Sequence, residues 1–184
     1  MKQGLPENRI YALPAEDNWW SPGDNGPCGP CSEMFYDMSG NVGDLSHEEF
    51  LQAVKDERVI EIWNDVFMEY EKKEGKVIGK NVDTGAGLER MTAVMQGKQT
   101  AYDTDLFGEL ISKIKDLSSV KNEKLERIVA DHIRTAIFMV SDGVLPSNSD
   151  RGYILRRLLR RSIRASHALT MNNDYNSLVP IILN

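Results

Sequence analysis

Cysteine and long apolar runs are both scarce in this sequence. Only Cys28 and Cys31 are present among the 184 residues, and two cysteines cannot build a disulfide scaffold, which favours a reducing compartment. No apolar run approaches the roughly 18 residues that a membrane-spanning helix needs, and no signal-peptide pattern opens the chain. We therefore expect a cytoplasmic protein without a membrane partner.

Charge is unevenly distributed along the chain. The whole sequence has 22 Lys and Arg against 28 Asp and Glu, a formal net charge of −6. Residues 151–173 nevertheless contain arginines and no carboxylate. A cationic patch on an acidic protein indicates a polyanionic partner, although a solvated helix face has the same composition.

The first half of the chain has strand-like segments between long loops. Residues 14–32 are rich in Gly, Pro, Asp and Asn, which predicts a structured loop, and residues 34–37 have extended character. Residues 46–54 suit one or two helical turns. Residues 58–70 are rich in β-branched and aromatic side chains and indicate a long strand, followed by a turn at Glu74-Gly75 and a hairpin partner over residues 76–79. These segments predict an antiparallel sheet.

After Gly87 the apolar period changes from two to about 3.6 residues, which predicts helices. The expected helices run from Leu88 to Gly97, over residues 105–117, from an Asn122 cap to a stop at Asp142-Gly143, and over about residues 150–167. The chain is therefore expected to be α+β, with a mixed part over residues 1–100 and a helical part over residues 101–184.

The last of these helices carries an arginine stripe, defined as Arg156, Arg157, Arg160, Arg161 and Arg164. At 100° per residue these side chains fall within an arc of about 140°. The opposite side, which is expected to face the core, is formed by Ile154, Leu155, Leu158, Leu159 and Ile163. Guanidinium groups at this spacing repel one another and suit phosphates, so the stripe favours nucleic-acid contact over a merely solvated face.

A single amide interrupts an apolar row in the strand over residues 58–70. Ile60, Ile62, Asn64 and Val66 share a face by parity. A half-buried amide needs a partner, which is either another group of the protein or a small polar ligand. Glu61 has the opposite parity, so it cannot face the same ligand as Asn64 unless a β-bulge intervenes.

Residues 81–90 combine a carboxylate, glycines and a helix start. Asp83 suits an ammonium group, Arg90 suits a phosphate, and Gly85 and Gly87 allow close approach of a ligand. This pattern alone is a weak indication of a nucleotide or amino-acid site, because it lacks the Walker lysine and the dinucleotide spacing.

Cys28-x-x-Cys31 is one half of a structural zinc motif. No second pair exists, and the three histidines are not spaced to complete a site. A turn stiffened by Pro27 and Pro30 is therefore the favoured interpretation.

Several motifs, in order, resemble the catalytic domain of the alanyl-tRNA synthetases. They are Asp17-Asn18-Trp19-Trp20, Gly26-Pro27-Cys28-Gly29-Pro30-Cys31-Ser32-Glu33, Glu61-Ile62-Trp63-Asn64, Asp83-Thr84-Gly85-Ala86-Gly87-Leu88-Glu89-Arg90, Ala130-Asp131-His132-Ile133-Arg134, and the run from Asp142 through Asn148 to Arg157. The resemblance implies a class II synthetase fold, in which an antiparallel sheet with flanking helices precedes a helical tRNA-recognition domain. It also implies an enzyme that joins alanine to ATP as alanyl-adenylate and transfers the alanyl group to tRNA.

The resemblance assigns roles to individual residues. Trp20, Asn64, Asp83 and Gly85 would bind alanine, and Gly87, Arg90 and Glu61 would bind ATP, with Mg²⁺ accompanying the ATP through Glu61. Asn148 would read the G·U pair of the tRNA(Ala) acceptor stem, while Arg151 and the arginine stripe would hold phosphates. No covalent catalytic residue and no zinc are expected.

Other parts of the family's pattern have no counterpart here. We find neither motif 1, nor the motif 2 arginine, nor the metal-binding His and Cys residues of the editing domain. We therefore expect a fragment that is inactive without the remainder of the synthetase, with residues 1–100 as the C-terminal half of the aminoacylation domain and residues 101–184 as the start of the tRNA-recognition domain. The alternatives are a non-catalytic RNA-binding module derived from a synthetase, and a small zinc protein built on the two cysteines.

Overall fold

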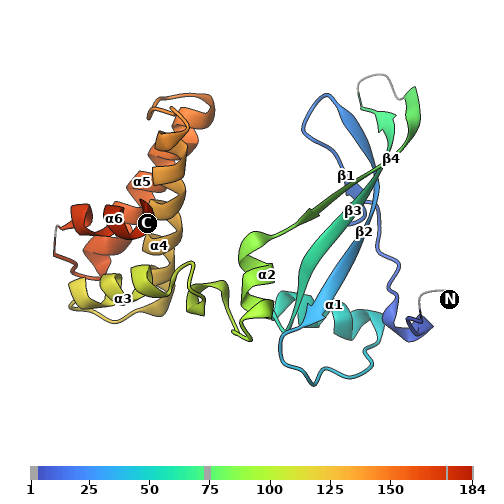
Figure 1. The fold of residues 1–184 in the computed structure, drawn as a ribbon, viewed down its shortest axis with the longest axis horizontal. Helices are drawn as coiled ribbons and strands as arrows, with labels where there is room; N and C mark the ends of the chain where they lie inside the picture. Colours follow the sequence, from blue (N-terminus) through green and yellow to red (C-terminus); the bar gives the residue numbers. More distant parts are fainter. Residues whose placement is uncertain (1–3, 73–75, 173, 184) are drawn as a thin grey trace. The chain divides into compact units, whose positions relative to one another are not determined.

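The computed structural model describes residues 4–72, 76–172 and 174–183. The chain divides into two compact units, Met1–Thr100 and Ala101–Asn184, which we describe one at a time (Figure 1). The turn expected at Glu74-Gly75 lies outside the described residues. Within the described ranges, no helix is both long enough and apolar enough to cross a membrane.

The first unit is built on a four-stranded antiparallel sheet, which confirms the expected α+β class. Its strands are β1 (Trp19–Trp20), β2 (Pro27–Asp37), β3 (Val59–Glu71) and β4 (Lys76–Ala86), and they are ordered in space as in the chain. The long β3 and the helices α1 (His47–Lys55) and α2 (Leu88–Met95) lie where the sequence predicted them. A short 3-10 helix, η1 (Glu7–Arg9), precedes the sheet.

Two strands are longer than the sequence predicted. Residues 27–32 were expected in a loop but belong to β2, and β4 continues past residue 79 to Ala86. The β2–β3 register shifts between Cys28 and Cys31, so Pro30 is accommodated at an irregularity of the ladder. A β-carbon on Gly29 would lie 1.8 Å from the Phe67 carbonyl oxygen. Only glycine therefore permits this close approach of β2 to β3.

A small core closes one end of this sheet. Phe50 and Ala53 of α1 pack with Val59 of β3, and Phe35 of β2 contacts the Phe50 ring at 5.1 Å. Ser46 and Glu49 form a capping box that explains where α1 begins. The core therefore holds the end of β2, the start of β3 and α1 together.

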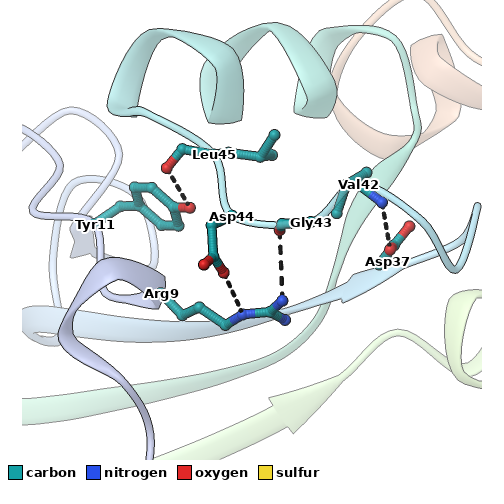
Figure 2. Close-up of polar contacts among 7 residues, drawn as sticks. All are labelled: Arg9, Tyr11, Asp37, Val42, Gly43, Asp44 and Leu45. Atoms are coloured by element: carbon teal, nitrogen blue, oxygen red, sulfur yellow. Dashed lines mark hydrogen bonds and ion pairs between the residues drawn. The ribbon is translucent and has the colours of Figure 1, made fainter.

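The loop between β2 and α1 is held by polar contacts (Figure 2). Asp37 accepts a hydrogen bond from the Val42 amide at 3.0 Å, and the Tyr11 hydroxyl donates to the Leu45 carbonyl at 3.0 Å. Arg9 reaches the same loop and pairs with Asp44 at 3.4 Å. Each contact joins the loop to β2 or to the segment that contains Arg9 and Tyr11, so the loop has a defined conformation.

The second unit is helical, as expected. Its elements are η2 (Ala101–Asp103), α3 (Gly108–Leu117), α4 (Glu123–Ser141), α5 (Asp150–Ala168), η3 (Tyr175–Leu178) and α6 (Val179–Leu183). Asn122 caps α4 by accepting from the Leu125 amide at 3.2 Å, which confirms its predicted role. Helix α3 begins three residues later than expected, because Thr104 and Phe107 lie in the turns before it.

The buried side of α5 differs from the predicted one. Ile154 and Ile163 were expected in the core but are 42% and 46% exposed. The buried residues are instead mostly small, namely Gly152, Leu155, Ser162, Ala165 and Ser166. A β-carbon on Gly152 would lie 2.3 Å from Ser147 Oγ, so the helix start is too closely packed for a larger residue.

Candidate functional site

The candidate site of the first unit lies on one face of the sheet. The strand register places Glu33 of β2 opposite Asn64 of β3, and Asn64 opposite Gly85 of β4. In the next row Cys31 lies opposite Val66, and Val66 lies opposite Asp83. Because directly opposed residues of antiparallel strands project to the same face, these two rows share one surface.

An irregularity in β3 brings Glu61 to this face. Glu33 lies opposite Asn64 and Phe35 lies opposite Glu61, so β3 has one residue more than β2 between the two pairs. Such a bulge reverses the parity of the residues beyond it. Glu61 and Asn64 thus project to the same side of the sheet. From their parity in the sequence, the two residues could face one ligand only if such a bulge intervened.

The Asn64 amide is only half satisfied. Its Nδ2 donates to Glu33 Oε1 at 3.0 Å. Its Oδ1 is buried and has no hydrogen-bond partner within the described part of the chain. A buried carbonyl oxygen without a donor is unfavourable, and such groups in native proteins need an explanation.

Acidic groups crowd around this amide. Burial raises the pKa of Glu33, and the nearby carboxylates of Glu61 and Asp17 raise it further, while the Arg90 charge opposes them. The Cys31 thiol lies 4.0 Å from Glu33 Oε1, and its pKa is raised by burial despite a contact with Asn64. Carboxylates that raise the pKa of Glu33 in this way favour a cation placed among them.

Arg90 lies beside the same acidic groups. It belongs to the first turn of α2, which begins directly after Gly87. Its Nη1 donates to Glu61 Oε2 at 2.9 Å and to the Glu61 backbone oxygen at 3.1 Å. The ion pair holds the guanidinium group at the end of β3, with 53% of its side chain still exposed.

The other residues predicted to bind alanine lie on strands at opposite edges of the sheet. Asp83 and Gly85 are exposed on β4, and a β-carbon added to Gly85 would meet no atom within 4 Å, so there is open space beside Asn64. Trp20 lies on β1, at the opposite edge of the sheet from β4. Three strand spacings separate these edges, about 14 Å between backbones, so the sheet does not place Trp20 beside Asp83.

In the second unit the arginine stripe and Arg151 are exposed on α5. Arg156 Nη1 donates to Asn148 Oδ1. Among the described residues no carboxylate forms an ion pair with any arginine of the stripe. Asp150, between Asn148 and the stripe, has a left-handed backbone with φ of 50°, which is uncommon for a residue other than glycine.

The two cysteines do not form the predicted turn. Cys28 and Cys31 are free thiols buried within β2, at 3% and 9% exposure. The irregular register at Gly29-Pro30 lets the strand continue through a sequence that resembles a turn. In the described residues no group of three or more His, Cys, Asp and Glu side chains is placed to hold a metal ion.

Sequence reasoning did not assign a role to Glu33 or Asp17. Glu33 was noted only as the last residue of the Gly26–Glu33 motif, directly after the segment expected to be a loop. Had residues 27–37 been recognised as a strand, parity would have placed Glu33 on the face of Cys31. The pairing with Asn64 also requires the β2–β3 register, which the sequence alone does not provide.

The antiparallel sheet with flanking helices, and the acidic face beside a helix with an arginine in its first turn, are consistent with the fold of the class II synthetases. The comparisons agree, since the family model described as tRNA synthetases class II (A) matches residues 1–184. This chain belongs to that family.

Individual relatives are closely similar to the chain. The alanine–tRNA ligase of Sphingopyxis alaskensis is 47% identical over 177 residues, which are 90% of this chain and 20% of the relative. That of Myxococcus xanthus is 46% identical over 89% of this chain, and that of Magnetococcus marinus is 44% identical over 94%. The chain spans about a fifth of the length of these relatives.

Proposed function

We propose that this chain is part of an alanine–tRNA ligase, which activates alanine with ATP to alanyl-adenylate and transfers the alanyl group to tRNA(Ala). The observation that carries the proposal is the row formed by Glu33, Asn64 and Gly85, with Asp83 one row away. It combines carboxylates, an unfilled amide oxygen and open space over a glycine, which together suit a small ligand with an ammonium group. The high identity to ligases with that name supports the same conclusion.

Alanine binding follows from the residues of this face. The Asp83 carboxylate would hold the ammonium group, Asn64 would orient the amino acid, and the open space over Gly85 would take the small side chain. Trp20 would close the pocket from the other edge of the sheet. A small pocket with charged partners selects by size and by the penalty of leaving those partners unpaired.

ATP binding would use the segment around the start of α2. Arg90, held by Glu61, would contact the phosphates, and Gly87 would allow the nucleotide to approach the backbone. Mg²⁺ accompanying ATP takes oxygen ligands, and the Glu61 carboxylate is of that type. In adenylate formation a carboxylate oxygen of alanine attacks the α-phosphorus and pyrophosphate leaves, so cationic groups near the phosphates offset developing charge.

The tRNA acceptor stem would contact α5. Exposed arginines that form no ion pair with the carboxylates of the described residues suit a phosphate backbone, and Arg151 lies at the start of the same helix. Asn148 would reach a base edge of the G·U pair, with its side chain held by Arg156. These contacts belong to the proposal for the second unit, residues 101–184.

The proposal is tested by alanine-dependent exchange of pyrophosphate into ATP. We expect the natural protein that carries this sequence to catalyse exchange with alanine and far more weakly with serine or glycine. The isolated 184-residue chain is expected to show none, because it has no counterpart of the motif 2 arginine. Tight binding of tRNA by a natural protein without any exchange would instead favour the non-catalytic RNA-binding module.

A further inference from the structure

The orphaned oxygen of Asn64 is the starting point. Several polar groups near that side chain have partners, since Nδ2 donates to Glu33, Glu61 pairs with Arg90, and the Cys31 thiol lies 3.8 Å from the Asp17 backbone oxygen. Asn64 Oδ1 is buried and lacks a donor among the described residues. Asn64 Oδ1 is therefore a buried acceptor that the described residues leave unfilled.

The orientation of the amide is determined by Glu33. An amide can present either its NH₂ group or its oxygen in a given direction. If the Asn64 amide were rotated by half a turn, its oxygen would face the oxygen Glu33 Oε1, at the 3.0 Å now spanned by a hydrogen bond. Two acceptors at that distance repel, so an ionised Glu33 selects the orientation in which Nδ2 faces it.

We propose that Glu33 is a positioning residue, which holds the Asn64 amide so that its oxygen meets a hydrogen-bond donor of the ligand, the α-ammonium group of alanine. This inference rests on the proposed function, because it names the ligand group that Asn64 receives. Glu33 itself acts through Asn64 and is not a catalytic residue.

The surroundings support an ammonium donor over a neutral one. Glu61 and Asp17 add negative charge near Glu33, and Asp83 lies on the same face one row away. A cation bound at Asn64 Oδ1 would be stabilised by these carboxylates and would supply the missing hydrogen bond. A ligand carboxylate in that position would instead be repelled.

The first test compares Glu33→Ala and Glu33→Gln in the natural protein, using alanine-dependent pyrophosphate exchange. Glu33→Ala should raise KM for alanine about 10-fold or more, the loss of a well-placed hydrogen bond, with little change in KM for ATP. Glu33→Gln should retain most of the wild-type KM, because a glutamine oxygen can still accept from Asn64 Nδ2. Glu48→Ala, on the exposed side of α1, is the matched control and should leave both constants unchanged.

The second test exchanges donor and acceptor. Asn64→Asp alone places a carboxylate against Glu33 and should impair alanine binding more than Glu33→Ala does. In the double variant E33Q/N64D the glutamine NH₂ group can donate to the new carboxylate, whose second oxygen then faces the ligand. We expect the double variant to recover at least part of the lost affinity relative to N64D, and an unfolded Glu33→Ala protein would not affect this comparison.

The outcomes separate the two proposals. Absence of alanine-dependent exchange in the wild-type protein would refute the proposed function itself. Normal exchange in the wild type, with a Glu33→Ala effect that is undiminished when Asn64 is already alanine, would overturn the positioning role and leave the proposed function standing. Failure of E33Q to rescue N64D would likewise count against the positioning role.

Discussion

Two carboxylates four residues apart on β2 have opposite environments. Asp37 accepts hydrogen bonds from the amides of Ser39 and Gly40, both at 2.9 Å, and from that of Val42 at 3.0 Å. Burial alone would raise its pKa, but these hydrogen bonds outweigh burial and lower it. Glu33 has one amide donor and several carboxylates nearby, and its pKa is raised.

The two carboxylates therefore have different roles, since Asp37 stabilises the fold and Glu33 belongs to the proposed binding site. Asp37 has its acceptor capacity filled by the β2–α1 loop, so it stabilises the fold and has little left for a ligand (Figure 2). Glu33 and its neighbours carry charge and an unfilled acceptor that the fold does not satisfy. Groups left unsatisfied by the protein are where a ligand gains most, and they occur at functional sites.

The largest expected effect concerns Asp83. In the natural protein, Asp83→Ala should lower kcat/KM for alanine activation by about 100-fold or more, because the ammonium group loses a charged partner. Asp37→Asn, which changes the carboxylate outside the proposed site, should leave kcat/KM near the wild-type value. The measurement is pyrophosphate exchange at varied alanine concentration. If the Asp83→Ala enzyme were as active as wild type, Asp83 would not be part of the alanine site.

A pair of glycines gives the next largest effect. A methyl group on Gly85 enters open space, so Gly85→Ala should leave melting temperature unchanged and raise KM for alanine by about 10-fold, the scale of one methylene in a pocket. Gly29→Ala should disrupt folding, because its β-carbon would lie 1.8 Å from the Phe67 oxygen. Thermal melting and exchange kinetics of both variants distinguish the two. A destabilised Gly85→Ala protein would show that the space over β4 is structural.

Much of the fold could be predicted because local signals and packing agree. The β-branched run of β3, the Asn122 cap and the stops at Gly97 and Gly143 each act within a few residues, and the structure has elements where they indicate. The N-terminal half of β2 could not be predicted. Its prolines and glycines indicate turns locally, and only pairing with β1 and β3 makes that segment a strand.

The site was less predictable than the fold. Asn64 stood out because an amide in an apolar row needs a partner, and the structure supplies half of one. The identity of that partner depends on the register between β2 and β3, and the approach of Glu61 depends on a bulge. Register and bulges are set by contacts distant in sequence, so parity counted along one strand cannot reveal them.

The second unit contains the same contrast between satisfied and unsatisfied groups. Arg156 donates to Asn148, whereas Arg157 and Arg161 are exposed and have no ion pair among the described residues. Replacing Arg157 and Arg161 together should weaken binding to every RNA about equally and flatten its salt dependence, since fewer counterions are released.

Asn148→Ala should instead lower the preference for a G·U-bearing stem by about 1–3 kcal/mol. Filter binding or anisotropy at several salt concentrations measures both. RNA affinity indifferent to salt and to the arginine pair would make the stripe a solvated face.

The smallest expected effect is on the pH dependence of stability. The lowered pKa of Asp37 contributes stability that is present above its ordinary value of 3.8 and is lost as pH falls through the lowered value. Asp37→Asn should therefore cost about 1 kcal/mol at neutral pH, the scale of a hydrogen bond, and progressively less in acid.

The contribution of Glu33 to stability depends on pH in the opposite direction. It is complete below the ordinary pKa of 4.5 and is lost as pH rises through the raised pKa. Glu33→Gln should therefore become more stable relative to wild type as pH rises through that window. Melting temperatures of the wild-type protein and both variants across the acidic range, with hydrogen exchange of the Gly40 and Val42 amides, measure the two slopes. Parallel slopes for the two variants would show that the environments of Asp37 and Glu33 do not differ in the way that their hydrogen bonds indicate.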